Sequence, residues 1–143
     1  MWVYAFLFAS RESANKINDE AWTVRAQAYC MTAQNVRFSL EDLTEMNPND
    51  SQALKKKAQI VEKATDALET AINAIANDTP NDEKGQAIVP LWIDEYRMYL
   101  KDRRLFAQTL RTATTRPYFA ETEVEGVPVS ERLGKFAREN KMK

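Results

Sequence analysis

Apolar residues recur at helical spacing along most of the chain, and the pattern predicts three long helices. The first spans residues 10–46, because neither glycine nor proline interrupts the chain before Asn47. At about 100° per residue, its two apolar rows merge into one broad arc, which predicts contact with two neighbouring helices. The rows are Ile17, Ala21, Val24, Ala28, Met31 and Phe38, and then Trp22, Tyr29, Val36 and Leu43 with Ala33 and Leu40.

Turn residues separate this helix from a second one over residues 51–77. The sequence NPND at 47–50 contains a proline that stops the first helix, and either Asp50 or Ser51 can cap the second. Large apolar residues then recur at intervals of seven, with alanines between them that let a neighbouring helix approach closely. These residues are Leu54, Val61, Leu68 and Ile75, with Ala58, Ala64, Ala71 and Ile72.

A third helix follows the loop at 77–85, with a capped start near Asp82, and runs to about residue 114, before Pro117. Pro90 lies inside the helical pattern, so we expect a kink or a short break there. The apolar side of this helix consists of Trp92, Tyr96, Tyr99, Phe106 and Leu110.

The residues from Pro117 onward no longer follow the pattern of a long helix. The segment PYFAETEVEGVPV favours a small hairpin, with arms at 118–124 and 127–129 around Glu125-Gly126, and an extended loop is the alternative. Ser130 can cap a last short helix, ERLGKFAREN. The predicted fold class is therefore all-α: an up-down-up bundle of three long helices, closed by a short β-hairpin-like segment and a short C-terminal helix.

The amino-acid composition limits the kinds of functional site that this chain can contain. The 143 residues include 20 basic and 21 acidic ones, so a net charge of −1 gives no general attraction to nucleic acid or anionic membranes. There are three glycines and no histidine, which excludes histidine as a general base or metal ligand. One cysteine cannot form a disulfide within the chain. We predict no enzymatic activity, no cofactor and no metal site.

The chain opens with nine apolar residues, MWVYAFLFA, which are too few for a bilayer-spanning helix of ~20 residues. Three interpretations compete: the outer half of a spanning helix that begins upstream, an apolar helix end that packs on this protein or a partner, and a cleaved signal. The last lacks the basic start that a signal peptide needs. We divide the chain into an apolar stub at 1–9 and one helical domain at 10–143. The residues expected to contact a membrane are Trp2, Tyr4, Phe6 and Phe8.

Several stretches carry a resemblance to a known group. DEKGQAIVPLWIDEYRMYLKDRRLFAQTLR, FAETEVEGVPVSERLGKFAREN, SRESANKINDEAW and the region of Cys30 resemble small uncharacterised actinobacterial proteins. Those proteins look like a single N-terminal membrane helix that carries a helical domain outside the cytoplasm. The resemblance implies an anchored, extracytoplasmic domain and names no activity. In that group a second cysteine tends to follow the segment that matches NKMK, at which this chain ends.

Cys30 is the single thiol. On the helical wheel it lies about 220° from Ile17, on the polar side with Gln27, Gln34 and Arg37, so a buried thiol is not expected. A catalytic cysteine needs a nearby base or cation, and the chain has no histidine. An idle surface thiol and, as the resemblance implies, a disulfide to a cysteine beyond residue 143 both stay open. The closing helix is expected to bring the 141–143 end close to Cys30.

The third helix carries a basic stripe within about 80° of the wheel. A solvated face is the plain interpretation, and contact with phosphates of nucleic acid or lipid is the alternative. The stripe consists of Arg97, Lys101, Arg104 and Arg111.

Two further charges are misplaced in apolar rows. Arg103 lies between Tyr99 and Phe106, and Asp42 lies in line with Val24. Counting along the helices puts Arg103 and Asp42 at the same height, so they are candidates for one buried ion pair, with snorkelling of Arg103 to solvent as the alternative.

The favoured function is a non-enzymatic, membrane-anchored, extracytoplasmic interaction or sensor-like domain. Its expected partners are the membrane, which it contacts through the N-terminus, and an unidentified protein. Nucleic acid is not expected as a partner. The expected location is the outer side of the cell membrane. The alternative is a soluble cytoplasmic helical adaptor or nucleic-acid-associated protein that uses the basic stripe.

Overall fold

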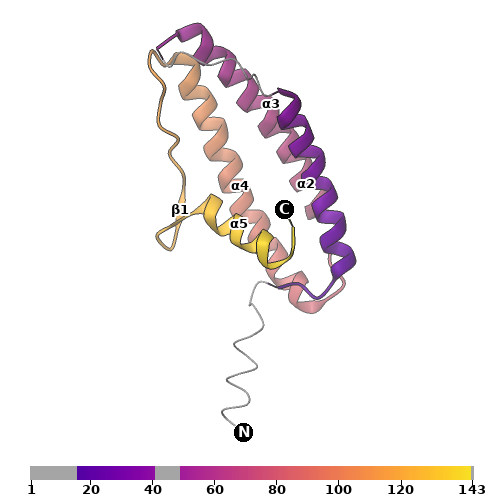
Figure 1. Cartoon of the computed structure of the whole chain (residues 1–143). Helices are drawn as coiled ribbons and strands as arrows, with labels where there is room; N and C mark the ends of the chain where they lie inside the picture. Colours follow the sequence, from indigo (N-terminus) through magenta and orange to yellow (C-terminus); the bar gives the residue numbers. More distant parts are fainter. Residues whose placement is uncertain (1–15, 41–48, 143) are drawn as a thin grey trace.

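The computed structural model describes residues 16–40 and 49–142. Within these ranges three long helices form an up-down-up bundle, followed by a small hairpin and a short helix (Figure 1). The predicted all-α bundle is therefore confirmed. The elements are α2 (Glu20–Leu40), α3 (Ser51–Ala76), α4 (Glu83–Thr112), β1 (Glu123–Val124), β2 (Val127–Pro128) and α5 (Val129–Glu139).

Side-chain caps set most helix starts. The carboxylate of Asp50 accepts the backbone N–H of Gln52 at 3.0 Å, and that of Asp82 accepts the N–H of Gly85 at 2.9 Å, as predicted for both helices. The first helix differs from its prediction, because residues 16–19 are not helical. Asp19 instead accepts the N–H of Trp22 at 3.0 Å and so begins α2 at Glu20.

Two local predictions near prolines and serines need correction. Of the kink or short break expected at Pro90, the break does not occur: α4 is continuous through this residue, which lies in its second turn. Ser130 does not cap α5: the helix begins at Val129, and the N–H of Ser130 donates to the carboxylate of Glu121 at 2.7 Å. The carboxylate of Glu121, in the preceding segment, thus accepts an N–H at the start of α5, which is the role that was expected of the serine hydroxyl.

The hairpin forms at the predicted site, but its arms are only two residues long. Glu125 and Gly126 both have positive φ, 55° and 77°, which is the geometry of a type I′ turn. Glu123 pairs with Pro128, and Val124 with Val127. The arms are short because Val129 already begins α5.

Helix α3 lies between the other two long helices and contacts both, while α5 packs on α4. The larger core cluster lies where α2, α3, α4 and α5 meet, and a second cluster joins the start of α3 to the end of α4. The largest fully buried side chains are Trp22, Leu54, Ile72, Ile75, Leu110, Val129 and Thr65.

The buried face of α2 corrects the sequence analysis. Its buried residues are Trp22, Ala26 and Ala33, whereas Val24 and Phe38, from the first predicted row, are 67% and 52% exposed. Within α2 the first row points outward, although Ile17 of that row, which precedes the helix, is buried. Of the second row, Trp22 and Ala33 are buried and Val36 is exposed. Two buried alanines let α2 approach its neighbours closely, and the residues on the opposite side of the helix then point outward.

The end of α5 holds the start of α2 in place. The side-chain oxygen of Asn140, which is 4% exposed, accepts the backbone N–H of Ile17 at 2.7 Å. Its amide group donates to the carbonyl of Phe136 at 2.9 Å. The short closing helix therefore lies across α4 and returns toward α2 (Figure 1).

Candidate functional site

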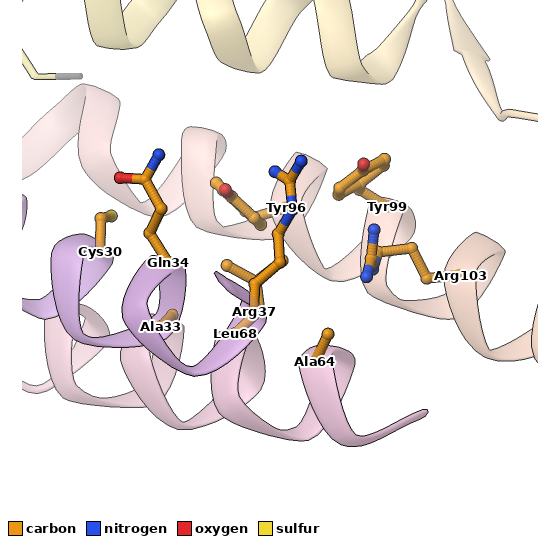
Figure 2. Close-up of a pocket in the computed structure, with 9 residues that line it drawn as sticks. All are labelled: Cys30, Ala33, Gln34, Arg37, Ala64, Leu68, Tyr96, Tyr99 and Arg103. Carbon is orange, nitrogen blue, oxygen red and sulfur yellow. The ribbon is translucent and has the colours of Figure 1, made fainter. Parts of the chain in front are cut away.

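Two adjoining cavities open between the helices, with volumes of about 210 and 250 Å³. Both are lined by Cys30, Tyr96 and Tyr99, so we treat them as one site, the central cleft. Figure 2 shows Gln34 and Arg37 rising from α2 on one side of the first cavity, while tyrosines and Arg103 extend from α4 on the other. The second cavity continues between α4 and α5, with Leu133, Gly134 and Met142 in its lining.

Aromatic rings form the wall on the α4 side. The rings of Trp92 and Tyr96 meet edge to face with centroids 5.3 Å apart, and Tyr96 meets Tyr99 in the same way at 6.1 Å. Phe136 of α5 stacks on Trp92 at 4.9 Å. Burial raises the pKa of Tyr96 above its usual value, so its hydroxyl stays protonated at physiological pH and can donate a hydrogen bond.

Arg103 is held by contacts other than a carboxylate in the described part of the chain. Its Nε donates to the hydroxyl of Thr65 at 3.0 Å, and its guanidinium lies 5.7 Å from the ring centroid of Tyr99. Thr65 is fully buried and donates in turn to the carbonyl of Val61 at 2.6 Å. Asp42, the predicted partner of Arg103, lies outside the described residues, so the ion pair stays a prediction.

Arg37 is the second cation at the central cleft. Its guanidinium lies 5.8 Å from the ring centroid of Phe38. Within residues 16–40 and 49–142, neither Arg37 nor Arg103 forms a salt bridge. The arginines that do pair with carboxylates there are Arg25, Arg104, Arg111 and Arg132. The two guanidinium groups at the cleft thus have no carboxylate partner among the described residues.

A buried donor lines the second cavity, away from these cations. Trp92 is 4% exposed and lines the second cavity, and its indole Nε1 has no hydrogen-bond acceptor among the described residues. A buried N–H without an acceptor is unfavourable by roughly 1–3 kcal/mol. An acceptor supplied from outside the protein would remove that penalty.

Cys30 does not lie on a solvated face. It is half-buried, packs against the larger core cluster and lines both cavities. Burial raises the pKa of its thiol, so the thiol is protonated at neutral pH. Met142 lines the second cavity together with Cys30, so the C-terminal end does come close to this residue. The pairing of Cys30 with a cysteine beyond residue 143 stays a prediction.

The basic stripe of α4 is largely engaged by α3. Arg104 binds Asp66 and Glu69, and Arg111 binds Glu62. Two members remain: the guanidinium of Arg97 donates to the side chain of Asn73 at 3.1 Å, and Lys101 is exposed. The stripe therefore joins two helices and offers phosphates few free cations.

Sequence reasoning did not find Gln34 and Arg37 as members of a site. Both lie on the side of α2 that the wheel assigned to solvent, and no pattern in the sequence indicates that α4 and α5 face them. The membrane-contact residues at 1–9 lie outside the described residues. In the part that the structure describes, no helix is long and apolar enough to cross a bilayer, and no cluster of three potential metal ligands occurs.

The side chains that line the central cleft are able to hold a ligand. Its described lining contains two arginines and no carboxylate. Two guanidinium groups, an amide and phenol hydroxyls can hold an anion, and the aromatic wall can hold an apolar body. No family model matches the chain, and no curated protein and no solved structure is similar to it. The central cleft is therefore interpreted from its own residues.

Proposed function

We propose that this protein is a non-enzymatic, sensor-like binding domain, held at the outer side of the cell membrane by its N-terminus, whose central cleft takes a small organic carboxylate. One observation carries the proposal. Arg37 and Arg103 reach the same cleft from different helices, and neither has a carboxylate partner in the described part of the chain. A ligand carboxylate would supply the missing charge.

The cleft also favours an apolar body on that ligand. Tyr96, Tyr99 and Trp92 present ring surfaces, and Leu133 and Met142 extend the apolar lining toward α5. Known ligand pockets have volumes of roughly 300–1,000 Å³. Each cavity alone is smaller than this, at about 210 and 250 Å³, and only the two together reach the lower end of the range, which suits a single ring or a short acyl chain.

Support for the membrane location comes from the N-terminal residues and from the resemblance described above. Cys30 lies 10 residues beyond Glu20, where α2 begins, so the cleft would stand roughly 15 Å along α2 from its start. An anchored bundle would thus present the cleft away from the bilayer. The alternative nucleic-acid role has no specific observation in its favour, because Arg104 and Arg111 already face α3 carboxylates.

The test uses 4-phenylbutyrate as the probe, measured by isothermal titration on the full chain. We expect saturable binding that weakens at least about tenfold when either arginine is replaced (Arg37→Met or Arg103→Met). Lys101→Met removes an equal charge from the exposed side of α4 and should leave binding unchanged. Equal affinity for the neutral 4-phenylbutanol, or unchanged affinity in both arginine variants, would overturn the proposal.

The location is tested separately by deleting residues 1–9. We expect the deletion to move the protein from the membrane fraction to the soluble fraction while its melting temperature changes by no more than a few degrees. A large loss of stability would mean that this segment belongs to the core, and the anchor would then be excluded.

A further inference from the structure

Helix α2 has a second apolar face that points away from the protein. Val24, Met31 and Phe38 are 67%, 48% and 52% exposed, and Ala21 and Ala28 between them are exposed too. Their spacing alternates between three and four residues, and on the helical wheel they lie opposite the buried residues of α2. We call these five residues, together with Asn35, the outer row. It spans 18 residues, or roughly 26 Å of helix.

Other exposed apolar residues do not form such a face. On α4, Leu91, Met98 and Leu105 are exposed at intervals of seven, but polar residues such as Asp94 and Lys101 lie between them. Where two helices pair, apolar residues occupy two positions, called a and d, of each seven-residue repeat, or heptad. The exposed residues of α4 supply only one of these positions, whereas the outer row of α2 supplies both.

We infer that the outer row binds the outer row of a second copy of this chain, with the two α2 helices parallel. Ala21, Ala28 and Asn35 occupy the a positions, and each meets its own counterpart in a parallel pair. The two Asn35 amides can then hydrogen-bond to each other. In an antiparallel pair with the rows fully overlapped, Asn35 would face Val24 and its amide would be buried without a partner.

The flanks of the outer row are complementary for the same arrangement. In a parallel pair, each residue on one flank faces the residue five positions further along on the other copy. Glu20 of each copy therefore faces Arg25 of the other, and no like charges meet. Arg25 already uses Nε and Nη2 to bind Asp78, which leaves Nη1 for Glu20. The remaining flank pairs are uncharged: Gln27 with Thr32, and Gln34 with Ser39.

The expected association is reversible and of moderate strength. Two three-heptad faces bury less than the roughly 1,200–2,000 Å² of a standard interface, so a dissociation constant in the micromolar range is expected. Helix α2 is already ordered by its contact with α3, so the dimer loses little further conformational entropy on forming. Both N-termini would emerge at the same end of the pair. The inference does not depend on what the central cleft binds.

Sedimentation velocity of the full chain over a broad concentration range tests the inference. We expect a monomer–dimer equilibrium that weakens at least about tenfold in Met31→Glu, because the variant would bury two like charges. Leu105→Glu, at a residue 60% exposed on α4, is the matched control and should not change it. Asn35→Leu should tighten the dimer, since a buried asparagine in an a position weakens association.

Orientation is tested by a disulfide in a Cys30→Ser background. Val24→Cys should cross-link efficiently under mild oxidation, because two d positions are adjacent in a parallel pair. In the antiparallel pair these residues would be roughly 16 Å apart along the axis, beyond the reach of a disulfide. Gln108→Cys, exposed on α4, is the control and should cross-link poorly.

Three results would overturn the inference: a monomer at every concentration, a dimer insensitive to Met31→Glu, and failure of Val24→Cys to exceed the control. If residues 1–9 of the same chain cover the outer row instead, Met31→Glu would lower the melting temperature of a monomer. That result would also count against the inference.

Discussion

Replacing Gly85 by alanine should destabilise this protein, although alanine is the better helix former. Gly85 lies in the first turn of α4 and is buried. A Cβ atom there would lie 2.9 Å from Cβ of Pro80 and 3.0 Å from Cγ2 of Ile17, and it would also overlap Oδ1 of Asp82. These distances are shorter than real Cβ contacts, so something must move.

None of the three neighbours can move easily. Pro80 is rigid, Ile17 is buried and its N–H is held by Asn140, and Asp82 caps α4 through its other oxygen. Overpacking of this kind is unfavourable by roughly 1–3 kcal/mol. The gain in helix propensity from glycine to alanine is about 1 kcal/mol. We therefore expect Gly85→Ala to lower the free energy of unfolding by about 1 kcal/mol, and by about 2 if the Asp82 cap is lost.

The measurement is urea unfolding followed by circular dichroism at a helical wavelength. Gly134→Ala in α5 is the matched control, because its Cβ would meet only the mobile tip of Arg138, at 3.2 Å. In Gly134→Ala the gain in helix propensity should outweigh this contact and raise the free energy of unfolding by up to about 1 kcal/mol. We therefore expect Gly85→Ala to lower the free energy of unfolding and Gly134→Ala to raise it. If Gly85→Ala were as stable as the natural protein, the close contact of Ile17, in the segment before α2, with the start of α4 would be wrong.

Three further predictions concern single side chains. Cys30 should react with iodoacetamide at pH 8 much more slowly in the folded protein than in urea, because burial raises its thiol pKa; equal rates would contradict the burial. Asn140→Ala should lower the free energy of unfolding by roughly 1–3 kcal/mol in urea titrations, because it leaves the N–H of Ile17 without its acceptor, whereas Lys141→Ala should have little effect. The backbone N–H group of Asn81, followed by that of Trp22, lowers the pKa of Asp19. The stability that this carboxylate contributes is therefore complete above its unfolded pKa of about 4, and it is lost as the pH falls through the lower folded pKa. Melting temperatures between pH 6 and pH 2 should therefore converge for the natural protein and Asp19→Ala, and a constant gap would refute the assignment.

The central cleft and the outer row use different sides of one helix. Arg37 and Cys30 of α2 line the cleft, while Met31 is exposed and points about 100° away from Cys30 around the helix. Ligand binding and pairing of two copies are therefore compatible in geometry. Whether one alters the other is measurable by repeating the sedimentation experiment with 4-phenylbutyrate present.

The sequence by itself determined which elements form and where α3 and α4 begin. Asp50 and Asp82 cap helices where the pattern indicated, and Glu125-Gly126 makes the hairpin turn. These features depend on interactions within a few residues, so local chemistry decides them. The apolar side of α4 was likewise predictable, because Trp92 and Leu110 belong to a single row and both are buried, one in each core cluster.

Only the tertiary structure decided which side of α2 faces inward. Periodicity determines the angle between residues of one helix, but a helix with apolar residues on opposite sides can turn either of them toward the core. Close packing against α3 selected the side with Trp22 and Ala26. That choice exposed Val24 and placed Cys30 in the central cleft, because residues of one rigid helix must rotate together.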